Sequence, residues 1–245
     1  MEKRRFYIDK DAIIGDKATL YDDERNHLVN VLRMNIGDEA ILVCGDGFDY
    51  VAKVILIEKQ YVLLEIISKD ANSAEPKKRL DVFQGVAKGE KMDLITQKLT
   101  ELGARALIPF VSTFTVAKEN TVKLDRLNKI TREAIKQCKR SNCLIVEEAV
   151  QFDEMLSRIG DYDLVIFAYE KEVDGNLNSF FTNLDTINKV AVIVGAEGGF
   201  SDEEAEKIVR AGAKIVTLGK RILRCETAAI VLSALVMYEM KEMNK

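Results

Sequence analysis

The chain has 245 residues, of which 47% are hydrophobic, and its formal net charge is only -4. A chain of this length buries a sizeable core and is long enough for two domains. The small negative charge excludes a uniformly basic coat, so any nucleic-acid contact must come from a local patch. Apolar runs of membrane-spanning length and an N-terminal signal sequence are both absent, which predicts a cytoplasmic protein without a membrane partner.

Four cysteines and one histidine limit the possible chemistry. The cysteines form no CxxC pair, so they are interpreted as reduced structural residues and no metal site is expected. His27 falls within a predicted helix over residues 22–33 and is interpreted as a surface residue of that helix, with an RNA contact as the alternative. Because serine and cysteine hydrolases need a histidine partner, nucleophilic and zinc-dependent hydrolysis are both disfavoured.

Residues 1–70 are dominated by short β-rich runs around that one helix. Closing such strands into a barrel removes their exposed edges, so these residues are expected to form a small closed or nearly closed barrel. The polar stretch that follows contains one of the two prolines, and residues 71–79 are predicted to be a linker. The predicted strands cover residues 5–8, 17–20, 39–43, 50–57 and 61–67.

Strands and helices alternate through residues 80–245, which predicts an α/β domain with a mostly parallel sheet of about six strands. The apolar start of the last helix, residues 228–237, indicates burial on more than one side. Either the core of one chain or a dimer interface accounts for it. The predicted strands cover residues 80–86, 106–110, 144–146, 163–168, 190–194 and 215–218, and the first two helices cover residues 91–102 and 125–140.

Two glycine motifs follow neighbouring strands near the C-terminus. The first is Gly195-Ala196-Glu197-Gly198-Gly199-Phe200, and Ser201 with Glu204 then forms a capping box at the start of a helix. The second is Leu218-Gly219, which leads into another helix. At the carboxyl ends of parallel strands such bare backbone favours a ligand pocket, with tight turns as the alternative. The glycine spacing and the missing lysine disfavour a dinucleotide or phosphate site.

These motifs, Gly195–Ser201 and Leu218-Gly219-Lys220-Arg221-Ile222-Leu223-Arg224-Cys225-Glu226-Thr227-Ala228, resemble the signature of the RsmE-type ribosomal RNA methyltransferases of the SPOUT superfamily. The resemblance extends over residues 27–33, 88–103 and 133–140, and it covers essentially the whole chain. It implies an α/β fold: a SPOUT methyltransferase domain, residues 80–245, with a C-terminal deep trefoil knot, preceded by a small PUA-like β-barrel RNA-binding domain, residues 1–70. Ala196 stands where the family usually has proline, which is expected to weaken the preorganisation of the loop.

The resemblance also implies an activity. It is S-adenosylmethionine-dependent methylation of N3 of a specific uridine in 16S ribosomal RNA, in the decoding region of the small subunit. The implied enzyme is a homodimer. Its substrate is expected to be the assembled or nearly assembled subunit, because a net charge of -4 leaves too little positive surface to hold flexible RNA by its phosphates. Two alternatives stay open: a SPOUT methyltransferase acting on another RNA, and a non-catalytic RNA-binding or assembly protein.

Candidate site residues follow from this chemistry. Arg224 is expected to stabilise the uridine anion or to position the target, with a structural ion pair to Glu226 or another carboxylate as the alternative. Glu197 is interpreted either as a base or as a capping or cofactor-orienting group. The cofactor pocket is expected to be formed by Gly195, Glu197, Gly198, Leu218, Gly219, Ile222, Leu223, Arg224, Thr227 and Ala228. RNA contacts are expected at Arg5, Arg33, Lys88, Lys98 and Arg140.

Overall fold

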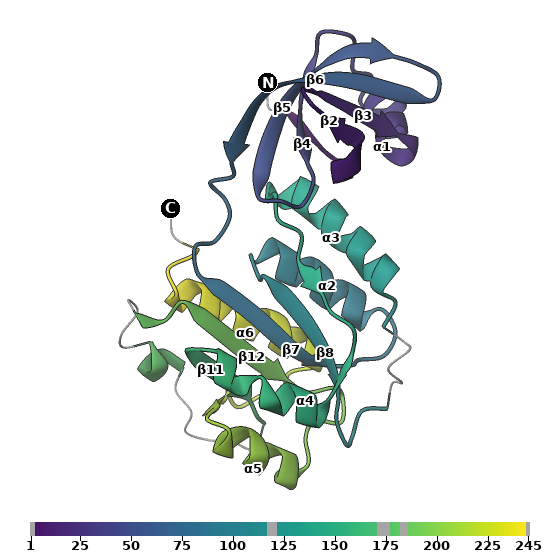
Figure 1. Cartoon of the computed structure of the whole chain (residues 1–245). Helices are drawn as coiled ribbons and strands as arrows, with labels where there is room; N and C mark the ends of the chain where they lie inside the picture. The colour runs from purple at the N-terminus through teal and green to yellow at the C-terminus, as the bar shows by residue number, and fades with distance from the viewer. Residues whose placement is uncertain (1–2, 117–121, 171–176, 182–185, 244–245) are drawn as a thin grey trace. The chain divides into compact units, whose positions relative to one another are not determined.

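The computed structural model (Figure 1) describes residues 3–116, 122–170, 177–181 and 186–243. It divides into two compact units, which are described separately: Met1–Glu75 with Arg132–Cys143, and Pro76–Thr131 with Leu144–Lys245. The segment Arg132–Cys143 therefore groups with the first unit, although the predicted domain ranges place it in the second. None of the described helices is long and apolar enough to cross a membrane.

The first unit is built on a six-stranded sheet with the order β1-β4-β5-β6-β3-β2. All neighbouring strands are antiparallel except the parallel pair β1 and β4. Fully buried side chains from several strands, including Phe6, Leu42 and Leu64, form its core. The strands are β1 (Arg4–Tyr7), β2 (Ile13–Ile14), β3 (Lys17–Tyr21), β4 (Glu39–Val43), β5 (Phe48–Ile57) and β6 (Tyr61–Ala71).

The predicted helix over residues 22–33 is corrected by the structure. The α-helix α1 (Asp22–Asn26) is short and continues as a π-helical turn, His27–Val31. The amide of Leu32 donates to the carbonyl of His27 at 2.9 Å, five residues back. A helical hydrophobic pattern cannot distinguish one such wider turn from an α-helical turn. Arg33 ends the segment in the left-handed region, with φ of 53°.

A polar network joins the late segment Arg132–Cys143 to the strands of the first unit. Arg5 forms an ion pair with Asp49 at 2.6 Å and donates to the hydroxyl of Ser141 at 2.8 Å. Glu75 accepts from the Ser141 amide at 2.6 Å and pairs with Arg140 at 3.1 Å. Because buried charges need partners, this network accounts for Arg5 and Arg140, two arginines that were expected from the sequence to contact RNA.

The second unit is built on a seven-stranded sheet in which every pairing is parallel. Its order is β10-β8-β7-β12-β11-β13, and β9 also pairs with β8. Two elements, β10 and α4, were not predicted because they are too short to show a period. The strands are β7 (Arg79–Gly85), β8 (Ala106–Val111), β9 (Ile145–Val146), β10 (Val150–Gln151), β11 (Leu164–Ala168), β12 (Lys189–Val194) and β13 (Lys214–Val216).

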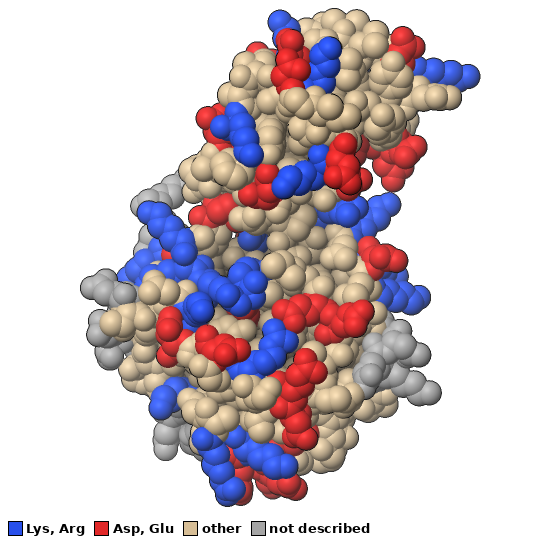
Figure 2. Space-filling model, viewed as in Figure 1, with Lys and Arg blue, Asp and Glu red and all other residues tan. Residues whose placement is uncertain are grey.

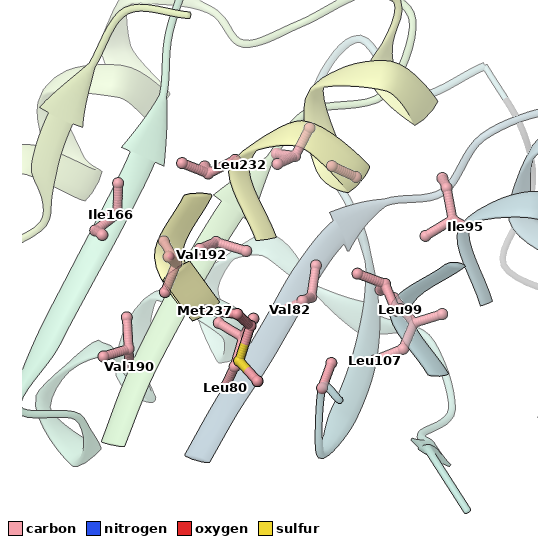
Figure 3. Close-up of a cluster of buried hydrophobic side chains, with 14 of the residues drawn as sticks. Leu80, Val82, Ile95, Leu99, Leu107, Ile166, Val190, Val192, Leu232 and Met237 are labelled. Atoms are coloured by element: carbon pink, nitrogen blue, oxygen red, sulfur yellow. The ribbon is translucent and has the colours of Figure 1, made fainter. Parts of the chain in front are cut away.

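Helices cover both faces of this sheet, so the unit has an apolar cluster on each side (Figure 1). On one face, side chains of β7 and β12 pack against α2 and α6, as Leu80, Val192 and Leu232 do in Figure 3. On the other face, the same strands pack against α4 and α5. The helices of this unit are α2 (Lys91–Glu101), α4 (Phe152–Ser157), α5 (Asp202–Arg210) and α6 (Cys225–Glu239). A further helix, α3 (Leu124–Cys138), begins in this unit and ends in the segment Arg132–Cys143 of the first unit.

One carboxylate is fully buried within this sheet. Asp81 of β7 pairs with Arg79 and with Arg105, each at 2.7 Å, and accepts from the Tyr162 hydroxyl at 2.9 Å. Burial acts to raise the pKa of Asp81, but the hydrogen bonds from the two arginines outweigh it and the pKa is lowered. Asp81 therefore stays ionised in the interior of the unit.

Candidate functional site

Parallel strands end at one edge of the second unit, and the first glycine loop begins there, after β12. The amide of Gly199 donates to the carbonyl of Ala196 at 3.0 Å, which closes a turn, and Gly199 has φ of 67°. A side chain at Gly85, the last residue of β7, would place its Cβ only 2.2 Å from the Ala196 nitrogen. Gln84 donates from Nε2 to the carbonyl of Gly195 at 3.1 Å. The loop is thus seated directly on the end of β7.

The helix after this loop begins as predicted. The Ser201 hydroxyl accepts from the Glu204 amide at 3.2 Å, and the Glu204 carboxylate accepts from the Ser201 amide at 3.0 Å. The capping box is therefore confirmed. Glu204 also accepts from the amide of Thr113 at 2.8 Å, a residue just beyond β8. One carboxylate therefore caps α5 and fixes the turn that follows β8.

Gly198 has a role that the sequence did not indicate. A Cβ at this position would lie 2.7 Å from both the Cβ and the carbonyl oxygen of Phe114. The space that a side chain at Gly198 would need is therefore occupied by the turn after β8. The lack of a side chain at Gly198 allows two loops at the same sheet edge to touch.

The second loop, between β13 and α6, has the open backbone that a ligand site requires. Gly219 has φ of 100°, and a Cβ built there would meet no atom within 4 Å. Leu218 and Leu223 are half-buried and pack against the core, whereas Ile222 is 87% exposed. An extended ligand with both polar and apolar groups therefore fits against this backbone. Its apolar part would contact Leu218 and Leu223 rather than Ile222.

The start of α6 completes this second loop. Thr227 is exposed and Ala228 is buried in the first helical turn, and Arg224 is the residue before the helix. The thiol of Cys225 is buried and contacts the Glu226 carboxylate at 3.3 Å. Burial, with help from that carboxylate, raises the pKa of Cys225 to about 12. Cys225 is therefore a protonated thiol and not a nucleophile.

Arg224 is exposed at the N-terminus of α6, and its side chain makes no capping hydrogen bond. Within the described part of the chain, no carboxylate forms an ion pair with it. Glu226, the partner considered from the sequence, lies 3.9 Å from the Nζ of Lys91 instead. The structure thus leaves the Arg224 guanidinium available for a negatively charged group of a ligand.

Glu197 is held by the start of α2. Its carboxylate accepts from the Nζ of Lys91 at 2.8 Å and from the Lys88 amide at 3.1 Å. Burial acts to raise the pKa of Glu197, but these hydrogen bonds outweigh it and the pKa is lowered. A carboxylate with a lowered pKa is a weaker base, so the contacts favour an anchoring or orienting role over proton abstraction.

The residues expected to contact RNA differ in exposure. Arg33 of the first unit and Lys88 of the second are exposed, and neither has an ion-pair partner among the described residues. Lys98 pairs with Glu101 at 2.8 Å. The side chains of Arg5 and Arg140 are only 9% and 5% exposed and belong to the network of the first unit. On the face shown in Figure 2, several positive side chains lie together on one part of the surface, and positive and negative side chains are interspersed elsewhere.

Sequence reasoning missed three residues that position the first loop: Gln84, Gly85 and Lys91. A polar residue and a glycine at the end of an apolar strand were the available signal for the first two. Lys91 had no comparable signal, because it stands 106 residues from Glu197. Only the fold brings these two side chains together.

Comparisons with known proteins identify related families and relatives. A family model described as an RNA methyltransferase domain matches residues 74–237, and one described as an RNA methyltransferase PUA domain matches residues 20–67. The Bacillus subtilis protein named ribosomal RNA small subunit methyltransferase E is 32% identical over 225 residues, which is 89% of this chain and 88% of that protein.

Two solved structures have the same fold. Ribosomal RNA small subunit methyltransferase E from Neisseria gonorrhoeae, bound to S-adenosylmethionine, matches with a TM-score of 0.85 and 28% identity over 97% of this chain and 98% of that one. A putative methyltransferase from Legionella pneumophila, in complex with the same cofactor, matches with a TM-score of 0.84 and 26% identity over the same shares. The chain belongs to the family of RNA methyltransferases with a PUA domain that includes the ribosomal RNA small subunit methyltransferase E proteins.

Proposed function

We propose that this protein uses S-adenosylmethionine to methylate N3 of a specific uridine in the decoding region of 16S ribosomal RNA. Membership of the family supports RNA methyl transfer, and the relatives that bind this cofactor support the choice of donor. The resemblance of the two loops to the RsmE-type signature supports the uridine N3 target. The observation that carries the proposal in this chain is the exposed Arg224 beside the second loop, which has no ion-pair partner among the residues that the structure describes.

S-adenosylmethionine supplies a sulfonium whose methyl group is already electrophilic, so the protein mainly binds and aligns the reactants. In the proposal, the open backbone at Gly219 and the half-buried Leu218 and Leu223 hold the cofactor. Glu197, fixed by Lys91, orients the first loop. We also propose that the C-terminal part of the second unit forms the deep trefoil knot of the SPOUT superfamily.

The acceptor nitrogen needs help from the protein. N3 of uridine carries a proton, which would pass to solvent as the new bond from N3 to the methyl carbon forms. The bond from that carbon to sulfur would break at the same time and release the demethylated cofactor as a neutral thioether. The negative charge that develops spreads over the two carbonyl oxygens of the base. A guanidinium stabilises such a charge, and this is the role proposed for Arg224.

The proposed substrate is the assembled or nearly assembled small subunit. With a net charge of -4, and with Arg5 and Arg140 engaged in ion pairs, the protein has little free positive charge to hold flexible RNA by its phosphates. Shape-dependent contacts to a preorganised target therefore carry more of the specificity. Arg33 and Lys88 are the exposed cations proposed to contact the RNA.

A homodimer is part of the proposal because α6 carries a second apolar face. Val231, Leu235 and Tyr238 are 36%, 41% and 56% exposed and share one side of the helix, opposite the buried Leu232 and Val236. An apolar stripe of this kind on a single chain marks an interaction surface. A second copy of the chain is the proposed occupant.

Primer extension tests the proposed function. Purified protein and S-adenosylmethionine are incubated with small subunits, with deproteinised 16S RNA or with unrelated RNA. The proposal expects a stop at one uridine only with subunits, because a methyl group at N3 blocks Watson–Crick pairing. Modification of the unrelated RNA but not of the subunits would favour the alternative, a methyltransferase that acts on another RNA. Calorimetry that detects no cofactor binding would favour a non-catalytic RNA-binding protein.

A further inference from the structure

A surface beside the first loop takes no part in the proposed cofactor pocket. It is a cavity of about 670 Å³ lined by Thr113, Phe114, Thr115, Val116 and Gly198. Phe114 is 47% exposed and Val116 is 66% exposed. None of the described residues that line the cavity is charged, so this lining suits a neutral, flat group better than a phosphate.

The exposed position of Phe114 is built into the fold. The Thr115 amide donates to the Ser112 carbonyl at 3.0 Å, and the Ser112 amide donates to the Thr115 hydroxyl at 2.9 Å. On the other side of the turn, the Thr113 amide and hydroxyl donate to Glu204 at 2.8 and 3.0 Å. The hydrogen bonds on both sides hold the turn in place, and the aromatic ring stays on the surface.

This turn is also seated against the first loop. Because Gly198 has no side chain, the Cβ and the carbonyl of Phe114 occupy the space that a Cβ at Gly198 would need, 2.7 Å away. A flat group lying on the Phe114 ring is therefore adjacent to the loop that, in the proposed function, lies beside the methyl donor.

We propose that Phe114 stacks on the face of the target uracil once that base has left its helix. This inference rests on the proposed function. Unpaired RNA bases are commonly recognised by stacking on aromatic side chains. The adenine of the cofactor is the less suitable occupant, since ligand pockets bury most of a small molecule, whereas this ring is about half exposed. A base that belongs to a large RNA is shielded from solvent on its other side by the rest of that RNA.

A tryptophan at this position reports stacking without any methyl transfer. The chain contains no tryptophan, so Phe114→Trp introduces a single tryptophan, which can be excited selectively at wavelengths that tyrosine does not absorb. Octauridylate at millimolar concentration is expected to quench its fluorescence with a saturable curve, and S-adenosylmethionine alone is not. Quenching by the cofactor but not by octauridylate would assign the surface to the adenine, and quenching by neither would refute the stacking.

Removing the ring tests the same contact during catalysis. Phe114→Leu is expected to lower kcat/KM for small subunits at least about fivefold, within the roughly 5- to 150-fold range for one base stacked on one aromatic ring. Cofactor affinity and the thermal midpoint should not change, and Phe114→Tyr should restore activity. Phe48→Leu is the matched control, because Lys69 already lies 4.2 Å from the centroid of that ring.

The outcomes separate the two proposals. Unchanged kcat/KM in Phe114→Leu, or an equal loss of cofactor affinity, would overturn the role of Phe114. If the wild-type protein does not methylate subunits, the proposed function fails, and the fluorescence titration still decides whether Phe114 stacks on a base.

Discussion

Replacing Arg224 with alanine should separate catalysis from stability. The side chain is exposed, makes no capping hydrogen bond and has no ion-pair partner among the described residues. Its backbone carbonyl, which accepts from the Ala228 amide at 2.8 Å, is kept in the variant. The free energy of unfolding should therefore change by no more than about 0.5 kcal/mol, as for surface substitutions in general.

The effect on the methyl transfer should be much larger. If the guanidinium stabilises the charge that develops on the uracil, its loss should lower kcat about 10²- to 10³-fold, which corresponds to about 2.7–4 kcal/mol of transition-state stabilisation. Single-turnover transfer of a radiolabelled methyl group to small subunits measures this step. Arg210→Ala, which removes another exposed arginine, on α5, is the control. A variant at Arg224 that keeps the wild-type rate would refute the role, and one that loses only cofactor affinity would reassign it to binding.

Three further variants test other parts of the structure. Gly85→Ala would place a Cβ only 2.2 Å from the Ala196 nitrogen, so chemical denaturation should show that the free energy of unfolding falls by about 1–3 kcal/mol. Calorimetry should show weakened cofactor binding. A variant with the stability and the cofactor affinity of the wild-type protein would contradict the placement of the first loop. The pKa of Asp81 is lowered, so its stabilising effect is present above the unfolded pKa and is lost as the pH falls through the folded pKa. Asp81→Asn should lower the free energy of unfolding by about 3–5 kcal/mol at neutral pH and should flatten the loss of stability below about pH 4. Equal dependence of stability on pH in the variant and the wild-type protein would refute this. Leu235→Glu should convert a dimer into a species of 27.6 kDa by light scattering, and a wild-type protein of that mass would rule out the dimer.

Local features of the sequence were predictive where one segment determines its own structure. The apolar runs that became β12 and β13, the loops after them, and the capping box of Ser201 and Glu204 all follow from neighbouring residues. The π-helical turn at His27–Val31 was not predicted, because it differs from an α-helical turn only in a backbone hydrogen bond that reaches five residues back instead of four.

Contacts between distant segments were not predictable from one sequence. Lys91 reaches Glu197 across 106 residues, and Arg5 reaches Ser141 across 136. Such contacts determine whether an arginine is a surface charge or one member of a buried ion pair. They also determine why a position requires glycine. Gly198 makes room for Phe114, a residue without any sequence signal for function.

A map of modified nucleosides in 16S ribosomal RNA tests the central claim most directly. Mass spectrometry of RNA fragments is compared between cells with the gene, cells without it and deletion cells that carry it on a plasmid. The proposed function expects one N3-methyluridine in the decoding region that disappears on deletion and returns with the plasmid. An unchanged map, or a lost methyl group on another atom or in another RNA, would contradict it.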